Sequence, residues 1–122
     1  MNKYTPDCWV KIRITSDEYG SIDKILAGWY GGYLNGDSWK INSGITKTEE
    51  FDDRYEFTGY TGSVYVCYKN AERMSGMTSS IYDSLVKQLE TVPGAKIEIL
   101  KCTLSDEILN INMGNAHITL KE

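Results

Sequence analysis

The sequence is poor in the residues from which metal and redox sites are built. It contains one histidine, His117, and three cysteines, at positions 8, 67 and 102. A conventional zinc site needs about four Cys or His ligands at short spacing, so we predict no protein-held metal. The cysteines form no Cys-x-x-Cys pair, and their odd number fits the free thiols of a reducing cytosol better than a disulfide framework. We expect three reduced, mostly buried thiols and no cofactor.

Long apolar runs and an excess of basic charge are also missing. No run approaches the ~18–20 residues of a membrane-spanning helix. The N-terminal stretch MNKYTPDCWVKI lacks the hydrophobic region of a signal peptide. The formal net charge is −4, whereas generic nucleic-acid binding needs a clustered basic face. We therefore expect a cytoplasmic protein without a membrane or generic nucleic-acid partner.

The motifs of common enzyme classes are not found either. The sequence has no G-x-S-x-G nucleophile elbow, no G-x-G-x-x-G phosphate loop and no EF-hand spacing in its acidic segment 49–53. Cys67 lies within a β-prone run, and only His117 could activate a thiol. A buried, inert cysteine is therefore the better interpretation. No catalytic residue is predicted.

Tyrosine and glycine, in contrast, are abundant. Nine tyrosines stand against two phenylalanines, and such rings are favoured where one end stays hydrated. In the stretch AGWYGGYLNGDSWKINSGI, aromatic and glycine residues surround Asn35-Gly36, a dipeptide typical of a type I′ β-turn. We expect strands near residues 28–34 and 38–42 joined by this turn, with a bulge at Gly31-Gly32.

Alternation of apolar and polar residues predicts further strands. The clearest covers residues 9–15, where Val10, Ile12 and Ile14 share one face, so this strand should be buried on that face only. The polar segment 46–54 is expected to be an exposed connection. Other strands are expected near residues 55–59, 63–69, 96–102, 108–113 and 116–120.

One segment has helical periodicity. Its apolar residues at helical spacing are Ile81, Leu85, Val86 and Leu89. This pattern predicts a helix over residues 79–91, capped by Thr78 or Ser79. Runs of strands with one helix are typical of the α+β class. We expect one α+β domain over residues 1–122, a curved, mainly antiparallel sheet of about six to eight strands packed on one helix.

The aromatic hairpin and its neighbours form the candidate binding surface. Because side chains alternate along a strand, about half of these rings should face the core. The others, with nearby cations, would suit a nucleobase carrying phosphate, or the side chains of a partner protein. The candidate ligand- or partner-binding residues are Trp29, Tyr33, Trp39, Lys40, Tyr60 and Arg73. An ordinary aromatic sheet face would explain these residues equally well.

The strings GWYGGYLNGDSWKINSGI and GYTGSVYVCYKNAERMSGMTSS give the chain a resemblance to small uncharacterised accessory proteins of tailed bacteriophages. The resemblance implies a viral protein in the cytoplasm of the host cell, often one that binds and neutralises a component of host defence. It carries over no catalytic residue.

We therefore expect a non-enzymatic binding protein, a phage-type counter-defence inhibitor. It would bind a host protein or sequester a small nucleotide signal, as a monomer or a homo-oligomer. One alternative is a small enzyme acting on a nucleotide or glycan, with carboxylates such as Asp37 and Glu56 as acid and base. A structural phage component is a second alternative.

Overall fold

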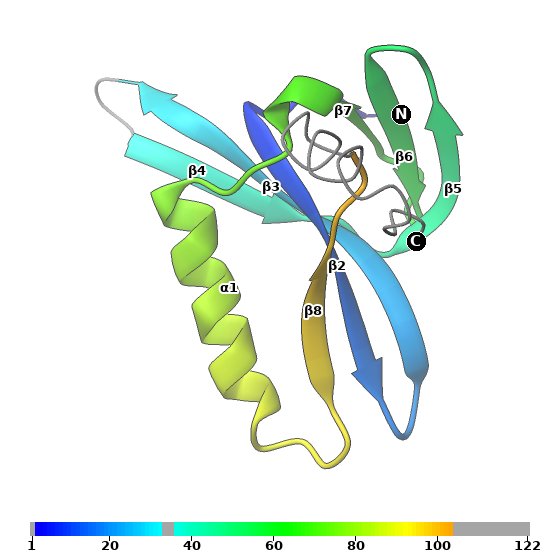
Figure 1. Cartoon of the computed structure of the whole chain (residues 1–122), viewed down its shortest axis with the longest axis vertical. Helices are drawn as coiled ribbons and strands as arrows, with labels where there is room; N and C mark the ends of the chain where they lie inside the picture. The colour runs from blue at the N-terminus through cyan, green and yellow to red at the C-terminus, as the bar shows by residue number, and fades with distance from the viewer. Residues whose placement is uncertain (1, 33–35, 104–122) are drawn as a thin grey trace, which may run out of the picture.

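The computed structural model describes residues 2–32 and 36–103 of the chain. Within them, eight strands form two four-stranded sheets, accompanied by one α-helix (Figure 1). The elements are β1 (Lys3–Tyr4), β2 (Cys8–Ser16), β3 (Gly20–Gly32), β4 (Gly36–Ile41), β5 (Ile45–Glu50), β6 (Arg54–Gly59), β7 (Val64–Tyr68), the short 3-10 helix η1 (Lys69–Ala71), α1 (Gly76–Leu89) and β8 (Lys96–Leu100). The strand order is β1-β7-β6-β5 in the first sheet and β4-β3-β2-β8 in the second.

The predicted α+β class is confirmed, but the single curved sheet is wrong. All strand pairs are antiparallel except β1 with β7. The division into two sheets follows from β2 and β3, whose paired segments 8–10 and 26–28 have no polar side chain on either face. Cys8, Trp9 and Val10 are all buried, although they point alternately to opposite sides. A strand that is apolar on both faces needs a layer on each side, and the first sheet and α1 are those layers.

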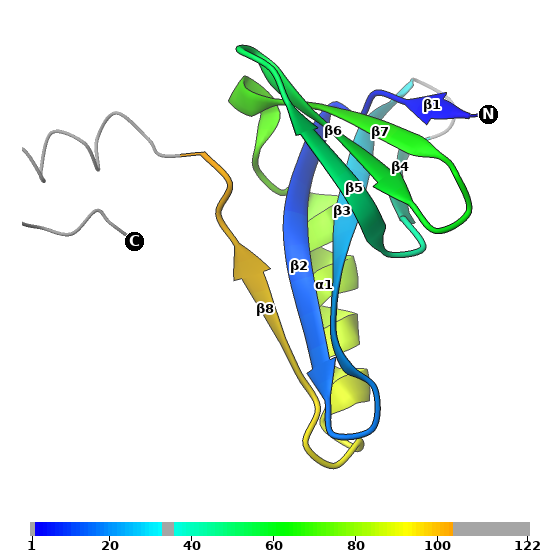
Figure 2. The ribbon, with the colours of Figure 1, turned by 90° about the vertical axis from the view of Figure 1, so that its right-hand side faces the viewer.

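An aromatic core fills the space between the two sheets. Trp9, Ile25 and Ala27 of the second sheet meet Phe57 and Tyr65 of the first. The Trp9 ring lies 5.8 Å from that of Phe57, and its indole Nε1 donates a 2.7 Å hydrogen bond to the carbonyl of Tyr68. The first sheet covers only one end of β2 and β3 (Figure 2). The predicted one-sided burial of residues 9–15 therefore holds only beyond that covered end.

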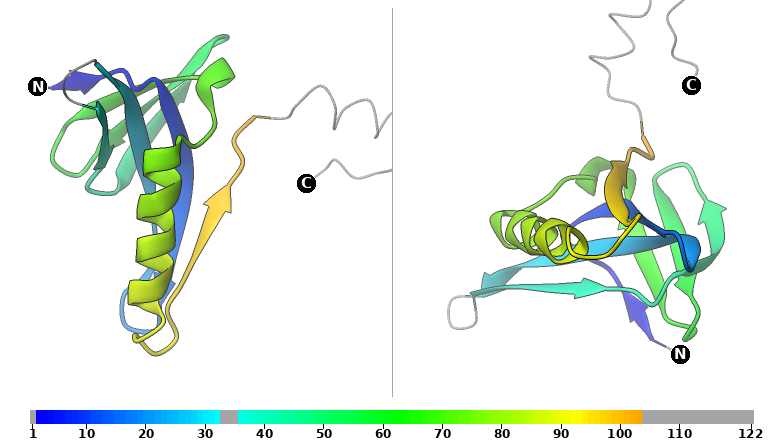
Figure 3. Two further views of the ribbon diagram at one scale, coloured as in Figure 1. Left: turned by 90° about the vertical axis from the view of Figure 1, so that its left-hand side faces the viewer. Right: turned by 90° about the horizontal axis from the view of Figure 1, so that it is seen from below.

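An aliphatic core lies on the opposite face of the second sheet. Val10, Ile12 and Leu26 are buried there, and Ile81 and Leu85 of α1 pack on them only partly buried. The helix is thus the third layer of the molecule (Figure 3). The packing of the predicted helical residues on the sheet is confirmed in outline.

The predicted hairpin is present as β3 and β4. Gly32 pairs with Gly36, and the register shifts between Trp29 and Gly32, which is the bulge expected at Gly31-Gly32. Gly36 has φ +66°, a conformation that glycine adopts without a Cβ clash. Asn35, the other residue of the predicted turn, lies outside the described residues.

Two boundaries differ from the sequence-based expectation. The segment 46–54 is not a connection, because most of it forms β5, an exposed edge strand. The helix begins before Thr78, since Ser75 is the N-cap: its hydroxyl accepts from the Thr78 amide, and the Thr78 hydroxyl accepts from the Ser75 amide. The hairpin predicted for residues 108–120 and His117 lie outside the described residues.

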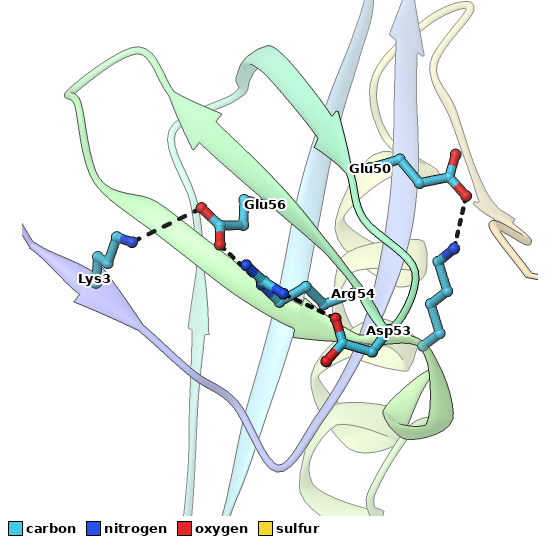
Figure 4. A network of polar contacts seen from close by, with 6 residues as sticks. Lys3, Glu50, Asp53, Arg54 and Glu56 are labelled. Atoms are coloured by element: carbon cyan, nitrogen blue, oxygen red, sulfur yellow. Dashed lines mark hydrogen bonds and ion pairs between the residues drawn. The ribbon is translucent and has the colours of Figure 1, made fainter.

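The outer face of the first sheet carries a network of ion pairs (Figure 4). Arg54 contacts Asp53 at 2.9 Å and Glu56 at 3.0 Å, and Lys3 lies 3.8 Å from Glu56. Opposite charges therefore neutralise one another on this face. Lys69 pairs with Glu50 at 2.7 Å on the other face, where the Lys69 ammonium lies 5.1 Å from the Tyr55 ring centroid.

Candidate ligand groove

A groove lies between the first sheet and the β3–β4 hairpin. It consists of two adjoining hollows of about 590 and 480 Å³, which share Tyr4, Trp39 and Lys40. We call their union the interlayer groove. The larger hollow is also lined by Lys24, Ile41, Asn42, Ser43, Gly59, Thr61, Ser63 and Tyr65, and the smaller by Lys3, Thr5, Trp29 and Ser38. Volumes of this size are typical of small-molecule sites.

One end of the groove is aromatic. The parallel pairing of β1 with β7 sets Tyr4 opposite Tyr65, with ring centroids 5.1 Å apart. The rings of Tyr4 and Trp29 also lie edge to face, with their centroids 6.3 Å apart. The Lys40 ammonium lies 5.2 Å from the Tyr4 ring centroid, within cation–π range. This end therefore offers ring surfaces with a positive charge beside them.

The other end is polar. Asn42 is 5% exposed, and its Oδ1 accepts a 2.9 Å hydrogen bond from the Ile25 amide at the edge of β3. The Asn42 Nδ2 has no partner among the described residues. The Thr61 amide donates to the Ser43 hydroxyl at 3.2 Å. Hydroxyl and amide groups thus line this end together with the Lys24 side chain.

The groove is positively charged in a chain of net charge −4. Three lysines and no described Asp or Glu line it. Lys3 shares Glu56 with Arg54, but Lys24 and Lys40 form no ion pair with any carboxylate of the described residues. Two ammonium groups therefore remain available to an anion in the groove.

Three of the six predicted binding residues lie together in the interlayer groove: Trp29, Trp39 and Lys40. Trp29 is partly buried against the aromatic core. Trp39 is 43% exposed. Because Gly28 pairs with Trp39 and Ala27 with Lys40, the Trp39 side chain leaves β4 on the face opposite to Lys40. Trp39 is therefore a rim residue of the groove.

Two of the other three predicted residues do not join this group. Arg73 is outside the groove lining, where its guanidinium contacts the Tyr30 hydroxyl at 3.3 Å and the carbonyls of Asn70 and Asp7. Tyr60 is 69% exposed in the turn after β6 and does not line the groove. Tyr33 lies outside the described residues.

Sequence reasoning missed Tyr4, Asn42 and Lys24. Tyr4 enters the groove through a two-residue strand, and Asn42 through a corner between the sheets. Neither has a local pattern that predicts its position. Lys24 has no such pattern either; it lies in β3, the strand that continues into the aromatic hairpin.

The carboxylates considered for catalysis have structural partners. The Asp37 Oδ1 accepts a 2.8 Å hydrogen bond from the Gly31 amide in the hairpin. Glu56 is held by Arg54 on the outer face of the first sheet. Within residues 2–32 and 36–103, no three His, Cys, Asp or Glu side chains are grouped so that they could hold a metal ion.

The three thiols are free, with Cys8 and Cys67 buried and Cys102 partly so. Burial raises the pKa of the Cys67 thiol far above its ordinary value, which disfavours the nucleophilic thiolate. Burial, with the negative charge of Glu72, raises the pKa of Cys102 to about 12. Neither thiol has the environment of a reactive cysteine.

Comparison with protein-family models, with curated proteins and with solved structures gave no match. The described part of the chain contains no helix with the length and apolar character that crossing a membrane requires.

Proposed function

We propose that this protein is a binding module that holds a small anionic, ring-bearing ligand of the nucleotide class in the interlayer groove. The observation that supports this most strongly is the lining of the groove. It combines aromatic side chains with two lysines that have no carboxylate partner among the described residues. Aromatic rings stack on bases, and lysine is a common phosphate binder.

Sequestration of the ligand follows from the same arrangement. Asp37 and Glu56 are engaged in structural contacts, and the cysteine environments do not favour thiolate chemistry. A module of this kind would lower the free concentration of a small nucleotide signal by holding it unchanged. The phage resemblance implies a protein that often binds and neutralises a component of host defence, and sequestration would be one form of that action.

Direct binding measurements test this proposal. The protein is titrated with adenosine, guanosine, cytidine and uridine 5′-monophosphates and with cyclic mononucleotides, and heat of binding is recorded. After denaturation, chromatography should recover the bound nucleotide unmodified. Hydrolysed product would favour the enzyme alternative, and absence of binding to any nucleotide would refute the proposal.

A matched pair of lysine variants locates the site. Lys40→Gln removes an ammonium group in the groove, whereas Lys87→Gln removes one on the exposed face of α1. We expect Lys40→Gln to weaken nucleotide binding about tenfold, as loss of a charge-assisted hydrogen bond does, and Lys87→Gln to have no effect. Equal effects of the two variants would mean that only the net charge matters.

A further inference from the structure

We propose that the polar end of the interlayer groove, beside Asn42 and Gly59, is the phosphate subsite, and that the ring of the ligand occupies the Tyr4–Trp29 end. This inference rests on the proposed function and adds the direction in which the ligand lies. It makes Asn42 and Lys24 the residues that distinguish a nucleotide from its parent nucleoside.

The first support is the unpartnered amide of Asn42. Its Oδ1 is fixed by the Ile25 amide, so the orientation of the side chain, with Nδ2 as the free donor, is determined. The Nδ2 atom is buried and has no hydrogen-bond partner within the described residues. Buried donors are nearly always satisfied, so an unpaired one in a groove wall indicates that an acceptor belongs there.

The second support is Gly59, which also lines the larger hollow. A Cβ placed on Gly59 would lie 2.8 Å from the Ser43 Oγ, 3.3 Å from the Gly44 carbonyl oxygen and 3.4 Å from the Asn42 Nδ2. A side chain at this position would collide with the Ser43 hydroxyl, so glycine lets Ser43 and Asn42 lie close to the backbone in the groove wall. Glycine commonly marks a place where a ligand approaches the backbone closely.

The third support is the distribution of hydrogen-bonding side chains along the groove. Lys24, Asn42, Ser43 and the hydroxyls of Thr61 and Ser63 line only the larger hollow, together with Ile41 and Tyr65. Trp29 lines only the smaller hollow, together with Lys3, Thr5 and Ser38. Lys40 and Tyr4 belong to both. A ligand with a flat ring at one end and an anion at the other would match this order of side chains.

Paired ligands test the direction. Adenosine 5′-monophosphate and adenosine are titrated into the wild-type protein, and the ratio of their dissociation constants measures the contribution of the phosphate. We expect the nucleotide to bind at least about tenfold more tightly. Asn42→Asp keeps the acceptor for Ile25 but replaces the donor with a negative charge, so it should bring the ratio close to one while adenosine binding is unchanged.

Two further variants keep the test decisive if Asn42→Asp fails to fold. Lys24→Gln should also reduce the ratio, and Tyr4→Leu should weaken both ligands equally, because it removes ring surface and no phosphate contact. If nucleotides bind but Asn42→Asp and Lys24→Gln leave the ratio unchanged, the subsite is wrong and the proposed function stands. If the wild-type protein binds neither adenosine nor any nucleotide of the panel above, both proposals fail.

Discussion

The two faces of the β2–β3 pair are packed very differently. Between the sheets, Trp9, Phe57 and Tyr65 are at most 3% exposed. On the helix side, Val10, Ile12 and Leu26 are buried, yet Thr78 is the one residue of α1 that is buried among those described. The aromatic face is thus sealed by a second sheet, and the helix face is only partly covered.

This difference bears on where a ligand can be held. The interlayer groove opens at the border of the sealed face, and its Tyr4 and Trp29 pack against the aromatic core. Residues anchored on a well-packed core keep their positions when a ligand arrives, which reduces the entropic cost of binding. We therefore expect the sealed face to provide both most of the stability and the binding surface.

The largest expected effect is the loss of Trp9. Trp9→Ala should destabilise the protein by about 3–5 kcal/mol, because the indole is fully buried and its Nε1 hydrogen bond is lost with it. Urea denaturation measures the change. Trp39→Ala is the matched control, since that ring is 43% exposed. An equal loss of stability in the two variants would show that the buried Trp9 ring contributes no more than the exposed Trp39 ring.

A smaller effect is expected on the helix face. Leu85→Ala should cost about 2 kcal/mol, at the low end for leucine truncations, because Leu85 is only partly buried. Leu26→Ala, on β3 of the same core, should cost more, since Leu26 is fully buried. If Leu85→Ala lost as much stability as Leu26→Ala, α1 would cover its face of the second sheet as completely as the first sheet covers the opposite face.

A modest effect of pH on the stability of the protein is expected from an ion pair where β2 and β3 extend beyond the first sheet. Arg13 Nε donates a 2.7 Å hydrogen bond to the Asp23 Oδ1, and this bond lowers the pKa of Asp23. The stabilisation is complete above the ordinary Asp pKa of about 3.9 and is lost as pH falls through the lowered folded-state pKa. Asp23→Asn should therefore flatten the fall in urea midpoint between about pH 5 and pH 2.

The control for that measurement is Asp53→Asn, because Asp53 is 62% exposed in its pair with Arg54. We expect this variant to follow the wild-type profile closely. A profile of Asp23→Asn that matched the wild type would show that the Arg13–Asp23 pair does not contribute.

The last expected effect involves no change in stability. Cys67 in the native protein should react slowly with a thiol reagent, because the thiol is buried and its pKa is raised. All three cysteines should react in denaturant. Rapid labelling of Cys67 in the native protein would mean that the aromatic core opens readily, and the face between the sheets would then not be sealed.

The sequence allowed much of the second sheet to be predicted. Alternation identified β2, and Asn35-Gly36 with its aromatic flanks identified the β3–β4 hairpin. Trp9 and Val10 are apolar residues on opposite faces of β2, and together they indicate a packing layer on each side of that strand. The alternation in residues 9–15 nevertheless favoured burial of one face only. The strand β5 is polar and exposed throughout most of its length, so it has no alternation to detect.

Only those residues of the site that belong to one hairpin could be predicted from the sequence. Trp29, Trp39 and Lys40 belong to one hairpin, and the sequence places them together. Tyr4 and Asn42 reach the groove through long-range contacts, the first by pairing beside Tyr65 and the second by its bond to Ile25. Such contacts depend on how the two sheets meet, which no short motif encodes.

The most direct test of the account is a nuclear magnetic resonance titration of the wild-type protein with adenosine 5′-monophosphate. We predict that the backbone amide shifts concentrate on the interlayer groove, at Tyr4, Lys40, Asn42 and Thr61, while the amides of α1 change little. Shifts concentrated on α1 or on the turn after β2, or no shifts at millimolar nucleotide, would contradict the claim that the sealed face carries the binding site.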